Sequence, residues 1–143
     1  MKSLRKIAVA LTSLFALVGC SFSMTLSSAG FKEKLEAAEY TVTYMSSNEY
    51  EESEMGQTIS TTGGFDDFIS AYKSNGENNP GEHLYVWFFM SIDNAETFYD
   101  FYSSELSGIK VDDGAKLTTG QKQNTVWCGT SAAAKVVDLN KIF

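Results

Sequence analysis

The chain has 143 residues, of which 43% are hydrophobic, and its 18 acidic and 11 basic residues give a formal net charge of −7. This acidic balance argues against binding to nucleic acid and against direct adhesion to anionic lipid head groups. The length is that of one domain, and the charge favours a solvated acidic surface.

The first 19 residues have the layout of an export signal. Lys2, Arg5 and Lys6 form a positively charged start, and an uncharged, mostly apolar run follows over residues 7–19. A helix of this length rises about 20 Å, which is short of the roughly 30 Å hydrocarbon core of a bilayer. A cleaved signal peptide therefore fits this segment better than a transmembrane span.

The apolar run ends in Leu17-Val18-Gly19-Cys20, which resembles the lipobox of bacterial lipoprotein precursors. In that family the cysteine is acylated on sulfur, the chain is cut just before it, and the new amino group is acylated. The resemblance implies removal of residues 1–19 and a lipid anchor on Cys20. It places the protein on the cell membrane or the outer membrane, facing away from the cytoplasm. The alternative is an ordinary secretory signal that happens to contain a cysteine.

Cleavage at the lipobox would leave a mature chain from Cys20 to Phe143. Removing three basic residues leaves 8 basic and 18 acidic ones, a formal charge of −10. One acyl chain anchors a protein only marginally, whereas two or three hold it on the membrane almost permanently. Residues 20–30 are predicted to be a short tether that keeps the domain near the membrane surface, and residues 31–143 a single globular domain.

The beginning of the globular part predicts one helix and one strand. A helix is expected over residues 31–39 with Ser28 as its cap, and alternation predicts a strand over 40–45. The acidic segment 46–56 is expected to be a surface loop, and residues 57–62 could form a short strand.

The middle of the chain predicts a hairpin. Residues 67–73 alternate as in a strand but also fit a helix. The turn-rich segment 74–82, which contains the only proline, favours a strand joined to the next one through a long loop. That next strand, 84–91, begins with an unbroken apolar run and suits the centre of a sheet.

A helix and two strands are predicted next. The helix is expected over residues 93–106, with Asp93 as its cap and Glu96 completing a capping box. The strands are expected over 115–119 and 124–129.

A last helix, capped by Thr130 or Ser131 and ending at Val137, completes the order α-β-β-β-α-β-β-α. This order predicts an α+β domain in which helices pack on one face of a largely antiparallel sheet. Cys128 is expected to be a small buried apolar residue in a strand. A disulfide to Cys20 is excluded if the sulfur of Cys20 carries a lipid.

The globular part is loosely similar to small bacterial lipoproteins of α+β type. In them an aromatic strand runs into an acidic-capped helix with a Phe-Tyr pair. The matching residues here are Trp87, Phe88, Phe89, Asp93, Ala95, Phe98 and Tyr99. The likeness implies a fold and no activity.

The sequence shows no catalytic motif, no metal-binding spacing and no cofactor site. His83, the only histidine, follows Glu82 at a turn and is expected on the surface. Residues 70–73 match a Ser-x-x-Lys pattern but lack the further boxes that such enzymes need. The acidic pairs 66–67 and 112–113 are expected to be caps and solvated loops.

The strongest candidate for a binding surface is a row of aromatic side chains on the predicted central strand. Alternation separates two rows, with Leu84, Val86, Phe88 and Met90 on one face and Tyr85, Trp87 and Phe89 on the other. If helices cover only the first row, the second needs a cover from a protein partner, a glycan, or the chain's own segments 46–56 and 57–66. We therefore expect Trp87 to be partly exposed.

The sequence thus favours a membrane-anchored, non-enzymatic binding or interaction module. The alternative is a small hydrolase of the cell envelope. A cleft that gathers Asp, Glu and His83 would support the enzyme, and an aromatic patch without them would support binding.

Overall fold

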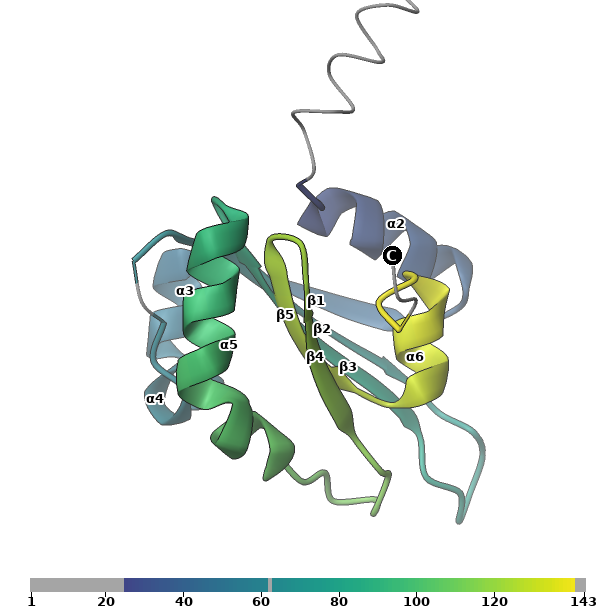
Figure 1. Cartoon of the computed structure of the whole chain (residues 1–143). Helices are drawn as coiled ribbons and strands as arrows, with labels where there is room; N and C mark the ends of the chain where they lie inside the picture. The colour runs from purple at the N-terminus through teal and green to yellow at the C-terminus, as the bar shows by residue number, and fades with distance from the viewer. Residues whose placement is uncertain (1–24, 62, 141–143) are drawn as a thin grey trace, which may run out of the picture.

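Residues 25–61 and 63–140 are described by the structure, a computed structural model, and they build a five-stranded antiparallel sheet with helices on both faces (Figure 1). The strand order is β1-β2-β3-β5-β4. The strands are β1 (Thr41–Ser46), β2 (Phe65–Lys73), β3 (Glu82–Phe89), β4 (Thr118–Lys122) and β5 (Thr125–Gly129). The helices are α2 (Ser28–Ala37), α3 (Ser47–Glu52), α4 (Glu54–Thr58), α5 (Ile92–Ser107) and α6 (Ser131–Val136).

The predicted α+β class and the antiparallel sheet are confirmed. Strands β2 and β3 form the expected hairpin, in which Ser70 pairs with Tyr85 and Tyr72 with His83. Strand β3 lies at the centre of the sheet between β2 and β5. Within the described residues no helix is both long enough and apolar enough to cross a membrane.

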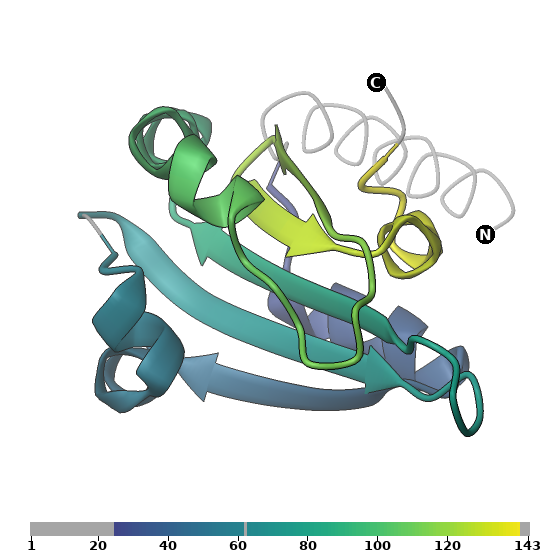
Figure 2. The same ribbon diagram turned by 90° about the horizontal axis from the view of Figure 1, so that it is seen from below.

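Helices cover both faces of the sheet, so the prediction that they pack on one face is wrong. Helices α2 and α6 lie over one face, and α3, α4 and α5 lie over the other (Figure 2). Each face has its own core. The first contains Leu84, Val86 and Phe88 with Phe31 and Leu35 of α2.

The second core is built around the other row of β3. Trp87 and Phe89 pack there with Phe98 of α5 and Tyr50 of α3. The row assignment by alternation is therefore confirmed for the residues inside β3. Met90 is the exception, because β3 ends at Phe89 and the Met90 side chain is 67% exposed.

The acidic segment that was expected to be a loop forms the short helices α3 and α4. The Ser46 hydroxyl accepts a hydrogen bond from the backbone N–H of Glu49, and the Glu49 carboxylate accepts one from the backbone N–H of Ser46. This capping box starts α3 directly after β1. The possible strand at 57–62 does not form over its described residues, since α4 runs to Thr58 and the chain is irregular over 59–61; residue 62 lies outside the described ranges.

The starts of the other helices differ slightly from prediction. Ser27, rather than Ser28, caps α2, and its side chain accepts a hydrogen bond from the backbone N–H of Gly30. Ser91, rather than Asp93, caps α5, and its hydroxyl accepts from the N–H of Asn94 at 3.1 Å. Thr130 occupies the N-cap position of α6, but its side chain makes no capping hydrogen bond to that helix.

Replacing Ser91 with alanine should lower the free energy of unfolding by about 0.5–2 kcal/mol, because the first turn of α5 loses its side-chain acceptor. Asp93→Ala is the matched control. It removes only a charge near the positive end of the helix, worth about 0.3–1 kcal/mol. Urea melts of both variants measure the difference, and a larger loss for Asp93→Ala would contradict this assignment of the cap.

Candidate functional site

The aromatic row proposed as a binding surface is mostly buried by the chain itself. Trp87 is 0% exposed and Phe89 is 1% exposed. The indole N–H of Trp87 donates to the hydroxyl of Tyr50 at 2.7 Å, and that hydroxyl donates to the carbonyl of Ile59 at 2.6 Å. The expectation of a partly exposed Trp87 is therefore wrong, and Trp87 and Phe89 are removed from the candidate binding surface.

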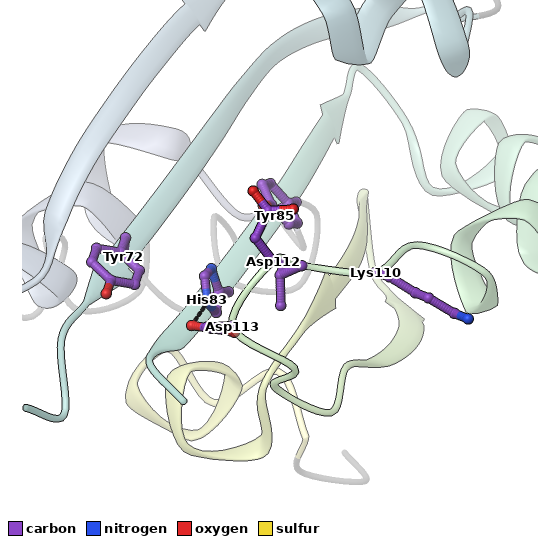
Figure 3. Close-up of a pocket in the computed structure, with 7 residues that line it drawn as sticks. Tyr72, His83, Tyr85, Lys110, Asp112 and Asp113 are labelled. Atoms are coloured by element: carbon purple, nitrogen blue, oxygen red, sulfur yellow. Dashed lines mark hydrogen bonds and ion pairs between the residues drawn. The ribbon is translucent and has the colours of Figure 1, made fainter. Parts of the chain in front are cut away.

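Tyr85, the third member of the row, lies at the border of an open cavity of about 380 Å³. The cavity is lined by Tyr72, His83, Tyr85, Lys110, Val111, Asp112 and Asp113 (Figure 3). His83 and Tyr85 continue the row of Trp87 along β3, and Tyr72 is the cross-strand partner of His83. The loop between α5 and β4 crosses the sheet here (Figure 2).

An imidazole–carboxylate pair holds this loop against the start of β3. Nε2 of His83 lies 2.7 Å from Oδ2 of Asp113. The backbone N–H of Gly81 donates to the same oxygen at 2.8 Å, and that of Ala115 donates to Oδ1 at 3.0 Å. The bond from His83, followed by the two backbone donors, lowers the pKa of Asp113 to about 2. The carboxylate is therefore ionised across the physiological range.

The backbone of His83 is fixed as firmly as its side chain. The N–H of His83 donates to Oγ1 of Thr130 at 3.2 Å, and the N–H of Thr130 donates to the carbonyl of His83 at 2.8 Å. Thr130 thus uses its hydroxyl on β3 instead of capping α6. The imidazole is consequently presented from a rigid strand end, as precise ligand contacts require.

Two tyrosines give the cavity an aromatic border. The ring of Tyr72 is 44% exposed and its centroid lies 5.0 Å from the imidazole of His83. Burial raises the pKa of Tyr85, and the nearby Cys128, Asp113 and Asp112 add to the rise. Tyr85 therefore keeps its phenolic proton at neutral pH and can donate it in a hydrogen bond.

Two exposed charges complete the lining. Asp112 lies beside Tyr85 and His83, whereas Lys110 extends away from them (Figure 3). Neither side chain forms an ion pair within the part of the chain that the structure describes. The Asp112 carboxylate is thus available to a ligand in the cavity.

The cavity combines an imidazole with carboxylates, and none of the described residues that line it is a serine, threonine or cysteine. Within the described ranges no side-chain hydroxyl or thiol is hydrogen-bonded to the imidazole of His83. The thiol of Cys128 is buried, as predicted, and donates to the carbonyl of Leu106 at 3.5 Å. Burial raises its pKa to about 11, which disfavours the reactive thiolate. No group of three potential metal ligands occurs in residues 25–61 and 63–140.

The remaining sequence candidates have structural roles. Ser70 and Lys73 lie in β2 rather than at a helix start, and the amino group of Lys73 donates to the carbonyl of Ala38 at 2.9 Å. Asp67 was expected to be a cap or solvated, but it is half-buried in β2. It accepts a hydrogen bond from the hydroxyl of Ser28 at 2.6 Å, and burial raises its pKa.

Sequence reasoning singled out His83 and Asp113 separately but could not pair them. Thirty positions separate them, and no motif links a turn histidine to an acid in a distant loop. The only available signal was that both lie beside glycine-rich turns. Comparison with known proteins finds no matching family model, no matching curated protein and no matching solved structure.

Proposed function

We propose that this protein is a membrane-anchored extracytoplasmic lipoprotein whose domain binds a ligand at the His83–Tyr85 cavity. The lipobox that ends at Cys20, preceded by a basic start and a short apolar run, supports the anchor. The cavity replaces the aromatic row as the candidate binding surface, and Tyr85, which is partly buried, is the one residue of the row that it keeps.

The observation that carries the binding role is the combination of polar and aromatic groups around an open cavity. Tyr72 offers an exposed aromatic ring and Tyr85 a phenolic donor, while Asp112 offers a carboxylate that forms no ion pair with any described residue. Ligand sites typically combine an apolar wall with a few fixed polar groups. A glycan or a polar peptide segment fits this lining, because a sugar ring or a peptide group can stack on tyrosine while its polar atoms bind the rim.

A small envelope hydrolase is the second candidate, and the His83–Asp113 pair favours it. A carboxylate that orients an imidazole leaves the other ring nitrogen free to accept a proton from water. The pair, however, also explains how the loop is held, since Asp113 receives two backbone N–H donors besides the imidazole. The cavity gathers His83 with two aspartates, the arrangement expected of an enzyme, but it also carries two tyrosines. Because Asp113 is engaged in holding the loop, we place binding ahead of hydrolysis.

Photo-crosslinking in intact cells tests the binding role on the anchored protein. A benzophenone amino acid at position 72 should yield a specific adduct, because Tyr72 borders the cavity. The matched control is position 44, since Tyr44 is an exposed tyrosine of the same sheet (48%) that lies outside the cavity. Adducts from position 44 alone, or none from position 72, would contradict the proposal.

Tyr72→Ala should weaken binding of the crosslinked ligand by about 2 kcal/mol, the loss typical of an aromatic anchor. Titration of the purified domain with that ligand measures the loss, and Tyr44→Ala should leave the affinity unchanged. The His83→Gln variant distinguishes the hydrolase alternative from the binding role. If turnover of the ligand is observed and is lost in this variant while binding persists, the cavity is catalytic.

A further inference from the structure

A buried asparagine fixes the chain where it enters the domain. Asn124, in the turn between β4 and β5, is 3% exposed. Its side chain accepts from the N–H of Leu26 at 2.5 Å and donates to the carbonyls of Leu26 at 2.9 Å and Phe89 at 3.1 Å. Leu26 is therefore held at the end of β3 that carries Phe89.

This attachment point sets how far the domain can stand from a lipid on Cys20. Only six residues lead from Cys20 to Leu26. Even when fully extended they span at most about 22 Å. The Leu26 end of the sheet must then lie within that distance of the bilayer surface, and the free tether is shorter than the predicted 20–30 segment.

The ligand cavity lies at the other end of the same strand. Six residues separate His83 from Phe89 along β3, which corresponds to about 20 Å. Figure 1 shows this separation, with the first turn of α2 at one end of the sheet and both the β2–β3 loop and the α5–β4 loop at the opposite end.

The two ends also differ in chemistry. Met90 is 67% exposed and borders a hollow with Leu26, whereas the loop over residues 74–80 at the opposite end is polar and exposed throughout. Asp66 and Asp67 border the same hollow as Met90, which favours contact with zwitterionic rather than anionic head groups.

We infer that the domain stands on the bilayer with its Leu26–Met90 end against zwitterionic head groups and its His83–Tyr85 cavity opening away from that membrane. This inference rests on the proposed lipidation of Cys20. It implies that the ligand reaches the cavity from the aqueous compartment around the domain or from a surface that faces the membrane. The ligand would not come from the lipids of the membrane that holds the anchor.

Site-specific quenching tests this orientation on the lipidated full chain. Single cysteines replace Met90, Phe101 and Glu77 in a Cys128→Ala background, and each is labelled with the same fluorophore. All three positions are exposed. Position 90 marks the end of the domain proposed to face the membrane, position 101 lies on α5, and position 77 lies in the loop at the opposite end. The proteins are placed in phosphatidylcholine vesicles that contain a nitroxide-labelled head-group lipid.

The expected result is a strong loss of fluorescence at position 90, a smaller loss at 101 and the smallest at 77. Greater quenching at 77 or 101 than at 90, or equal quenching at all three, overturns the orientation. Flotation of the vesicles is measured in parallel. If the protein floats with the vesicles but the order of quenching differs from the expected one, the orientation alone is refuted. If the protein does not float, both the lipid anchor and the orientation are refuted.

Discussion

Trp87→Ala should lower the free energy of unfolding by about 3–5 kcal/mol, as much as Phe88→Ala on the opposite face. The indole is fully buried between Phe68 of β2 and Phe98 of α5, with ring centroids 5.1 and 5.9 Å away. Removing it leaves a cavity and deprives the hydroxyl of Tyr50 of its donor. A loss of this size is a large part of the roughly 5–15 kcal/mol that stabilises a typical domain.

One further variant isolates the part of this loss that comes from the hydrogen bonds, and a second serves as the control. Tyr50→Phe keeps the ring but leaves the indole N–H of Trp87 and the carbonyl of Ile59 unpaired, which should cost about 1–3 kcal/mol. Phe101→Ala is the control, because this aromatic is 69% exposed and should change stability by less than about 0.5 kcal/mol. Urea melts compare the variants. A loss for Trp87→Ala near that of Phe101→Ala would show that the second face is not a core.

The local patterns of the sequence predicted four of the five strands and the long helix, whereas the strand expected over 115–119 is found three residues later, at Thr118–Lys122. The β2–β3 hairpin and α5 follow from short-range signals, namely alternation, a turn-rich connection and an apolar helical face. The apolar run from Leu84 to Phe89 also contains the sign that both faces are covered, because unbroken apolar strands are typical of sheets buried on both sides. Strand β3 follows this rule, since a separate core covers each of its faces.

Helix α3 was not predicted because its acidic composition is typical of a surface loop. Its acidic residues resemble a solvated loop, and its single buried side chain, Tyr50, provides no periodic pattern. The spacing of Ser46 and Glu49 was the available signal, since it satisfies the capping-box rule. Tyr50 then helps Phe68 and Phe98 to bury Trp87, a long-range contact that no local rule could foresee.

The candidate site depends on contacts between distant segments. His83 and Asp113 are 30 positions apart, and Leu26 and Asn124 are 98 apart. The first contact joins the loop between α5 and β4 to the start of β3, and the second joins the turn between β4 and β5 to the segment before α2. The sequence could name His83 and the acidic pair 112–113, but only the path of the loop between α5 and β4 shows that Asp113 is the one that meets His83.

Cys20→Ala should abolish fatty-acid labelling of the protein and release it from the membrane fraction or leave its signal uncut. The cysteine sulfur is the proposed acylation site, and each buried methylene of an acyl chain contributes about 0.8 kcal/mol, so two or three chains dominate attachment. Cys128→Ala is the matched control. The Cys128 thiol is buried inside β5 and should play no part, so this variant should be labelled like the wild type. Cells grown with a radioactive fatty acid provide the measurement, and equal labelling of Cys20→Ala and wild type would refute the anchor.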